Sequence, residues 1–159
     1  MAVLAKTKAG PQESRRWVAP TARYESRGAS LGIRSGNTPA LIEQLEAGFP
    51  FEALRIFEAN SGVELPVLAS ILGIPDRTLA RRRTTGRLAP EESERLLRIS
   101  TVFEKAVGLF EGDVASAVQW LTTSKKALGG QTPLVYSRTE PGAREVENLI
   151  GRVEHGVFS

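Results

Sequence analysis

A repeated three- and four-residue spacing of apolar side chains is the feature that most restricts how this chain can fold. The spacing is clearest between Pro90 and Phe110, where it runs through Leu96, Ile99, Phe103, Ala106 and Phe110. Residues at this spacing share one face of an α-helix, whereas a half-buried strand requires strict alternation. No segment alternates strongly enough to indicate a β-strand. The sequence therefore predicts an all-α fold.

Helix boundaries are marked by residues that favour caps, first turns and stops. Asn37 or Thr38 can cap the first helix, and Pro39 suits its first position. Together with the apolar spacing, such signals predict helices over residues 37–48, 51–62, 65–72, 76–84, 90–110, 114–121 and 141–155. The longest of these begins with acidic residues that suit the positive end of a helix dipole, namely Glu91, Glu92 and Glu94.

Composition allows a packed core and excludes several kinds of site. The chain has 159 residues, of which 41% are hydrophobic, and this is enough for a compact body without external staples. It contains no cysteine, which excludes a disulfide framework, a thiolate metal site and a cysteine nucleophile. No uncharged stretch approaches the roughly 20 apolar residues that span a bilayer, and Ala2 to Ala5 is too short for a signal-peptide core. We therefore expect a cytoplasmic protein with no membrane partner.

Charge is distributed unevenly along the chain, although its sum is only +3. Residues 1–36 hold seven Lys/Arg against two acidic residues, and residues 77–87 hold five Arg and no acid. Residues 37–76 carry one basic and six acidic residues. Basic charge concentrated in two short segments indicates a local contact with a polyanion.

The first 36 residues are rich in Gly, Ser, Arg and Lys, and no apolar periodicity persists in them for more than a turn. We interpret them as an irregular N-terminal arm. Trp17 and Tyr24 are unusual in such a segment, because isolated aromatic residues there tend to dock onto a body or a partner. A flexible tail is the alternative interpretation.

A helix-turn-helix pattern lies between Leu65 and about Thr84. Ala69 is small enough for a second helix to cross closely, and Gly73 can adopt the positive φ of a tight interhelical turn. Four aliphatic residues are spaced to fill the wedge between the two helices: Leu68, Leu72, Ile74 and Leu79. An ordinary helical hairpin remains an alternative on this pattern alone.

The second helix of this pattern has the composition of a helix that reads DNA. Leu79 is its only large apolar residue, so one side can attach to the core while polar residues point outward. Arginine reads guanine edges in the major groove or holds phosphates. A solvated basic face is the alternative. We predict the DNA-binding residues to be Arg77, Thr78, Arg81, Arg82, Arg83 and Arg87, with the first three toward bases and Arg83 and Arg87 toward the backbone.

Several ordered motifs together resemble the MbcA/ParS/Xre antitoxin family over roughly residues 50–156. Within the helix-turn-helix the motif is Thr78-Leu79-Ala80-Arg81-Arg82. The others follow in order: Gly86-Arg87-Leu88-Ala89-Pro90-Glu91-Glu92-Ser93-Glu94-Arg95-Leu96-Leu97-Arg98, Ala117-Val118-Gln119-Trp120-Leu121, Ala127-Leu128-Gly129-Gly130-Gln131-Thr132-Pro133, and Thr139-Glu140-Pro141-Gly142-Ala143 with Val146-Glu147-Asn148-Leu149-Ile150-Gly151-Arg152-Val153-Glu154-His155-Gly156. The N-terminal arm lies outside the resemblance.

The resemblance implies an antitoxin whose partner is a RES-domain toxin, an enzyme that destroys NAD. It also implies that the helix-turn-helix binds operator DNA at the operon's own promoter and that the C-terminal helical region covers the toxin's active site. The expected domains are an arm at 1–36, a DNA-binding domain at 37–88 and a helical toxin-binding domain at 89–159. Because palindromic operators need two-fold proteins, we expect an antitoxin dimer within a hetero-oligomer.

The chain end supports a hypothesis for neutralisation. An aromatic residue near the end, Phe158, favours burial by a partner, although packing on its own core is the alternative. NAD is anionic, so Glu147, Glu154 or the carboxylate of Ser159 can occupy a basic pocket. We expect the toxin-binding residues to be Arg144, Glu147, Asn148, Arg152, Glu154, His155, Val157, Phe158 and Ser159.

Other functions have less support. The chain has a single histidine, His155, and no Walker-type or dinucleotide-binding glycine loop, so we expect no enzyme activity, cofactor or metal. A free-standing helix-turn-helix transcription regulator with a C-terminal sensing module is the main alternative. A C-terminal interaction module whose enzyme partner has another fold also stays open.

Overall fold

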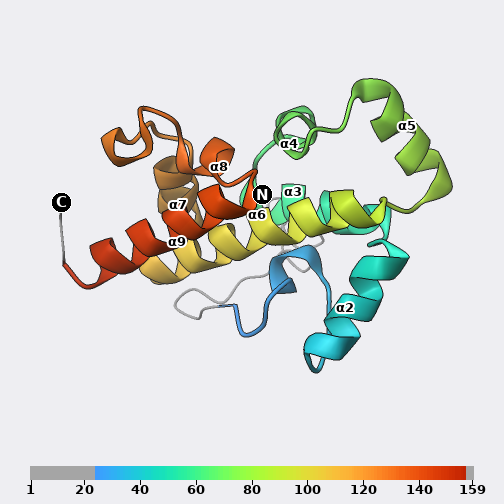
Figure 1. The fold of residues 1–159 in the computed structure, drawn as a ribbon, viewed down its shortest axis with the longest axis horizontal. Coiled ribbons are helices and arrows are strands. Elements are labelled where there is room, and N and C mark those ends of the chain that lie inside the picture. The colour runs from blue at the N-terminus through green and yellow to red at the C-terminus, as the bar shows by residue number, and fades with distance from the viewer. Residues whose placement is uncertain (1–23, 157–159) are drawn as a thin grey trace, which may run out of the picture.

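The computed structural model describes residues 24–156, and within that range the secondary structure is helical (Figure 1). The 3-10 helices are η1 (Ala29–Leu31) and η2 (Lys126–Leu128). The α-helices are α2 (Thr38–Ala47), α3 (Phe51–Ser61), α4 (Leu65–Leu72), α5 (Asp76–Thr85), α6 (Pro90–Leu109), α7 (Val114–Leu121), α8 (Pro133–Tyr136) and α9 (Glu140–Glu154). The only extended pairing described is an isolated antiparallel bridge between Pro50 and Arg87. The predicted all-α fold is confirmed.

Local side-chain chemistry sets the helix starts, as the sequence predicted. The Asn37 Oδ1 atom accepts a hydrogen bond from the Ala40 backbone N–H at 2.9 Å, which caps α2. A proline stands at the first or second position of α2, α4, α6, α8 and α9, where its missing N–H leaves no helical hydrogen bond unmade. The last helix begins at Glu140, one residue before the predicted start.

Helix α6 forms the centre of the molecule. It packs against η1, α2, α3 and α4 on the N-terminal side of the chain and against α7 and α9 on the C-terminal side (Figure 1). Its inward side chains are at most 1% exposed at Leu96, Ile99, Val102, Phe103, Ala106 and Val107. The Phe103 ring meets the Phe57 ring of α3 edge to face, with centroids 5.2 Å apart. One apolar core therefore joins both halves of the described chain.

Part of the predicted arm belongs to the packed body, which the sequence did not predict. The η1 turn packs against α3 and α6, and Leu31 and Ile33 are only 1% and 6% exposed. The Tyr24 ring lies 5.9 Å from the Phe103 ring, so Tyr24 docks onto the body as expected for an anchor. Trp17 lies outside the described residues. The division at residues 36 and 88 stays a prediction.

A buried polar cluster fastens the η1 turn to the core. The Ser30 backbone N–H and hydroxyl both donate to the Glu104 Oε2 atom, at 2.9 and 2.6 Å. The Asn60 amide donates to the Ser30 carbonyl at 3.0 Å. Burial raises the pKa of Glu104 above its ordinary value, although the hydrogen bonds from Ser30 act in the opposite direction. This turn is therefore held by hydrogen bonds between residues distant in sequence.

Replacing Glu104 with glutamine should remove one source of pH dependence from stability. Because the pKa of Glu104 is raised above 4.5 in the folded state, the folded chain retains this proton at pH values where the unfolded chain has lost it. The free energy of unfolding should therefore fall as pH rises from 4.5 through the folded pKa. The variant E104Q keeps an oxygen that accepts from Ser30 but binds no titrating proton, so that part of the decline should disappear.

Urea denaturation across about pH 4 to 8 measures this difference. The matched control is E94Q, which makes the same chemical change at an exposed glutamate on the same helix. The alanine variant E104A should lose about 1–3 kcal/mol, because it leaves the buried Ser30 donors without an acceptor. Parallel pH profiles for E104Q and the parent would contradict the assignment.

Candidate DNA-binding and partner-binding surfaces

The turn between α4 and α5 has the geometry of a helix-turn-helix. Gly73 ends α4 in the left-handed conformation, with φ 73° and ψ 30°, and the Ile74 N–H donates to the Ala69 carbonyl at 2.8 Å. Ala69 is 2% exposed, so its small side chain is buried at the end of α4 where the turn begins. The predicted wedge residues are all buried: Leu68, Leu72, Ile74 and Leu79. The helix-turn-helix prediction is confirmed.

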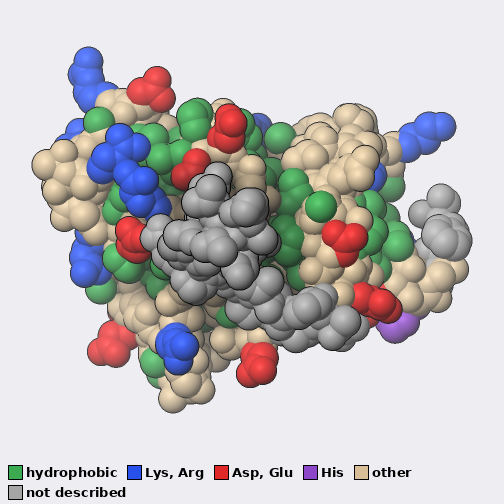
Figure 2. All heavy atoms as spheres, turned by 180° about the vertical axis from the view of Figure 1, so that it is seen from behind, with side chains coloured by type: hydrophobic (Ala, Val, Ile, Leu, Met, Phe, Trp, Pro, Cys, Tyr) green, Lys and Arg blue, Asp and Glu red, His purple; other side chains and the backbone are tan. Residues whose placement is uncertain are grey.

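Helix α5 lies at the edge of the molecule and attaches to it lightly (Figure 1). Leu79 is its only buried residue, while Arg77, Arg81 and Arg83 are exposed and Thr78 is half-buried. Figure 2, which shows the molecule from behind, has basic side chains gathered at the end of the molecule where α5 lies. This end presents a positive surface to solvent.

The predicted DNA-binding residues are not equivalent in the structure. Arg82 donates to the Glu92 carboxylate through Nε at 2.8 Å and through Nη2 at 3.0 Å. Arg87 donates to the Gly48 carbonyl at 2.5 Å. The Arg83 guanidinium lies 5.7 Å from the centre of the Phe51 ring. Arg77 and Arg81 thus differ from these three, which contact other parts of the chain.

Glu92 is the acidic partner of Arg82. This pairing was not predicted from the sequence, which showed only that Glu92 lies at the start of a helix. Its Oε1 atom also accepts from the Ala89 backbone N–H at 2.8 Å, closing the first turn of α6. Burial alone would raise the pKa of Glu92, but the hydrogen bonds from Arg82 and Ala89 outweigh it and hold the pKa below its ordinary value. Glu92 therefore remains charged near neutral pH.

A tight turn fixes the start of α9 against α8. The Thr139 hydroxyl accepts from the Gly142 N–H at 3.1 Å and caps the helix. A side chain on Gly142 would place its Cβ 1.8 Å from the Tyr136 carbonyl oxygen, so only glycine fits this approach. Ala143, Val146 and Ile150 then point into the core and are at most 4% exposed. The other face of α9 is left for contacts outside this core.

The outward face of α9 carries most of the predicted toxin-binding residues. Arg144, Asn148, Glu154 and His155 are exposed, and Glu147 and Arg152 are half-buried. The remaining three predicted residues lie outside the described residues: Val157, Phe158 and Ser159. Two ion pairs order this face, Arg144 with Glu140 at 2.6 Å and Lys105 of α6 with Glu147 at 3.3 Å.

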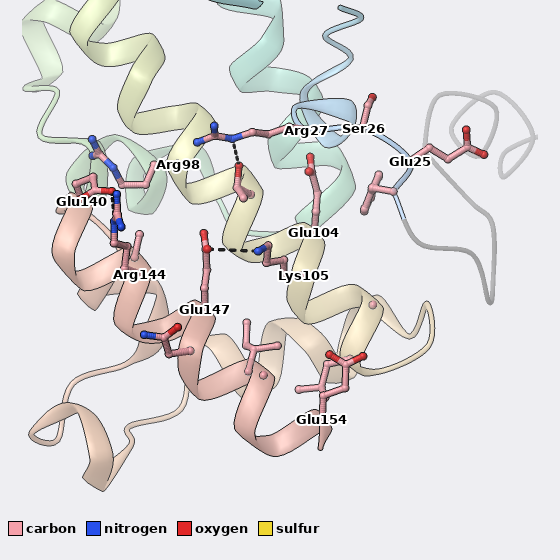
Figure 3. A pocket seen from close by; sticks show the side chains of 18 residues that line it. Glu25, Ser26, Arg27, Arg98, Glu104, Lys105, Glu140, Arg144, Glu147 and Glu154 are labelled. Carbon is pink, nitrogen blue, oxygen red and sulfur yellow. Dashed lines mark hydrogen bonds and ion pairs between the residues drawn. The ribbon is translucent and has the colours of Figure 1, made fainter. Parts of the chain in front are cut away.

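An open groove of about 860 Å³ runs between α6, α9 and residues 24–27 (Figure 3). It is lined by side chains of both signs, including Arg27, Arg98, Lys105, Glu147 and Glu154. Arg27 crosses toward α6 and donates to the Thr101 hydroxyl at 2.8 Å. Sequence reasoning missed this groove, because no local pattern shows that residues 24–27 lie beside α6 and α9.

The described residues also bear on metal binding and membrane insertion. Among residues 24–156, no cluster of three or more His, Asp or Glu residues could hold a metal ion. Over the same range, no helix combines the length and the apolar character needed to cross a bilayer.

Two parts of this chain match known protein families. Residues 40–100 match the antitoxin Xre-like helix-turn-helix domain. Residues 105–156 match the antitoxin Xre/MbcA/ParS C-terminal toxin-binding domain, which includes α7, α8 and α9. The resemblance inferred from the sequence motifs is therefore confirmed. The two matches imply two kinds of partner, DNA and a toxin protein.

Curated relatives share most of this length. The antitoxin Xre of Yersinia enterocolitica is 38% identical over 141 residues, which cover 88% of this chain and 95% of the relative. The antitoxin Xre of Photorhabdus laumondii is 36% identical over 131 residues, 82% of this chain and 88% of the relative. The antitoxin Xre of Pseudomonas putida is 32% identical over 84 residues, 52% of each chain. This chain therefore belongs to the Xre/MbcA/ParS antitoxin family, as a non-enzymatic antitoxin with an Xre-like helix-turn-helix and a C-terminal toxin-binding domain.

Proposed function

We propose that this antitoxin inhibits a RES-type, NAD-degrading toxin by covering its active site and represses its own operon by binding operator DNA. One observation carries the proposal: the two candidate surfaces lie at opposite ends of one body, with α5 at one end and the C-terminal end of α9 at the other (Figure 1). The shared core beneath them means that one folded chain presents both.

The DNA-binding half of the proposal rests on the exposure and charge of α5. An α-helix with its side chains is about 10–12 Å in diameter, which suits the roughly 12 Å width of the major groove. Arg77 and Arg81 are four residues apart, so they lie on the same face of the helix and away from Leu79. We propose that these two and Thr78 read base edges, that Arg83 holds the phosphate backbone, and that two copies bind a palindromic operator.

Replacing Arg81 with alanine should weaken operator binding more than binding to random DNA. A side chain that reads a base edge contributes about 1–3 kcal/mol of discrimination, so R81A should lose roughly tenfold to a hundredfold on the operator. Preference at one base position should relax. Fluorescence anisotropy with operator and scrambled duplexes measures both effects.

The matched control for this experiment is R138A, which removes the same charge from an exposed arginine in the turn between α8 and α9. It should leave operator binding within about twofold of the parent. Equal losses for R81A on operator and random DNA would show that Arg81 holds phosphate and that specificity lies elsewhere.

The toxin-binding half rests on the exposed face of α9 and on charge. A pocket that binds the pyrophosphate of NAD requires positive groups, and an acidic segment is suited to occupy it. Glu147 and Glu154 lie on α9 and line the groove beside α6. We propose that the outer face of α9 binds the toxin, with Arg144, Asn148, Arg152 and His155 as further contacts. Val157, Phe158 and Ser159 complete the proposed contact segment.

Ending the chain after Ile150 should separate toxin binding from inhibition. Ile150 is the last buried residue described, so removal of residues 151–159 leaves the core packing of α9 intact. Losing Phe158 from an interface removes about 1.5–3 kcal/mol, so affinity should fall by roughly one to two decades. NAD consumption by purified RES toxin in excess truncated antitoxin measures inhibition, and gel filtration measures complex formation. Full inhibition by the truncated protein would move the blocking role to residues 140–150.

A point variant tests the face of α9 without shortening the chain. Replacing the exposed Asn148 with arginine should weaken the toxin complex by at least about tenfold, because it places a long charged side chain in the proposed contact. The matched control A59R adds the same charge at an exposed position on α3 and should bind toxin like the parent. Unchanged co-purification of N148R with the toxin would contradict a contact at this face.

A further inference from the structure

Helix α5, which we propose to read DNA, packs lightly on the rest of the molecule for an element that must present side chains at a defined angle. Leu79, its only buried residue, is 9% exposed and sits near the middle of α5. A single apolar anchor leaves the rotation and tilt of a helix weakly restrained. The C-terminal end of α5 is also joined to α3, because the Phe51 N–H donates to the Gly86 carbonyl at 2.9 Å and the Arg83 guanidinium lies 5.7 Å from the Phe51 ring. A second attachment, to α6, would further restrain the orientation of Arg77 and Arg81.

Arg82 is placed to supply that second attachment. At 100° per residue, Arg82 lies about 60° from Leu79 around the helix, whereas Arg77 and Arg81 lie about 160° from Leu79 on the opposite face. The Arg82 guanidinium makes a two-bond contact with Glu92 of α6, at 2.8 and 3.0 Å. Such paired contacts restrict geometry more than a single hydrogen bond does.

Glu92 is itself held in place, so the contact is anchored at both ends. Its side chain is 10% exposed, and it also accepts from the Ala89 backbone N–H at 2.8 Å. It stands in the first turn of α6, where the helix dipole favours a negative charge. Because α6 is the central helix of the core, the pair links the angle of α5 to the helix that packs against the most other elements.

We propose that Arg82 and Glu92 form a positioning pair that sets the angle of α5, and that Arg82 acts on DNA only through this pair. The inference rests on the proposed binding of DNA by α5 and adds that the arginines of this helix have different roles. Arg82 makes no phosphate contact, because its guanidinium stays with Glu92 in the bound state. Arg81 contacts the DNA directly.

The salt dependence of operator affinity distinguishes the two roles. Each phosphate that a side chain neutralises contributes about −0.9 to the slope of log affinity against log salt. The variant R82Q should therefore weaken operator binding on the order of tenfold without changing the slope. The variant E92Q should weaken binding to a similar extent, although it removes a negative charge near the DNA and frees Arg82. The control R81Q should reduce the slope if it holds phosphate, or relax base preference if it reads a base.

A double-mutant cycle completes the test. If the residues act as one unit, R82Q/E92Q should bind the operator no more weakly than either single variant. Circular dichroism and urea denaturation verify that each variant is folded. If E92Q is unstable, R82Q still tests the pair, because it leaves Glu92 able to accept the hydrogen bond from the Ala89 N–H.

Either of two results with the single variants would overturn the proposal: a slope reduced in magnitude by about 0.9 per bound subunit in R82Q, or operator binding by E92Q as tight as or tighter than the parent. Additive losses in the double variant would also contradict it. The variant R81Q tests the proposed DNA-binding role of α5 separately. If R81Q binds operator like the parent, α5 is not the DNA-reading helix, and the proposed function fails rather than the pairing of Arg82 with Glu92.

Discussion

Burial of the two apolar sides of α6 is the constraint on which the rest of this structure depends. Phe103 contacts the ring of Phe57 on the N-terminal side of the chain, while other core residues of α6 meet α7 and α9. A fully buried side chain of this size contributes about 1.5–3 kcal/mol, so the long helix supplies much of the shared core. Neither the helix-turn-helix nor α9 can bury its apolar face without it.

This arrangement explains how one small chain serves two partners. The start of α6 holds Glu92, which contacts Arg82 of α5, and its later turns hold Lys105, which contacts Glu147 of α9. The helix proposed to bind DNA and the helix proposed to bind the toxin are therefore both attached to the same central helix. Because α5 and the C-terminal end of α9 lie at opposite ends of the molecule, the two proposed surfaces do not overlap (Figure 1).

The sequence predicted the structural features that depend on interactions between residues close together in the chain. The positive φ at Gly73, the small side chain at Ala69 and the cap at Asn37 each act within a few residues, and all were predicted. Contacts between distant residues left no such pattern. The bond between Ser30 and Glu104 joins residues 74 apart, and the Arg82 to Glu92 pair joins two helices, so the basic composition of α5 concealed which arginines were already engaged. The same limit applies to the groove beside residues 24–27.

The central claim is that one rigid body presents separate DNA-binding and toxin-binding surfaces, and simultaneous occupancy tests it most directly. Mass photometry of the antitoxin with the proposed RES-type toxin and an operator duplex measures whether all three assemble. The account predicts a ternary complex at equimolar toxin, with operator affinity within about tenfold of the free antitoxin, since the surfaces lie apart. Stoichiometric release of the operator as toxin binds would contradict it.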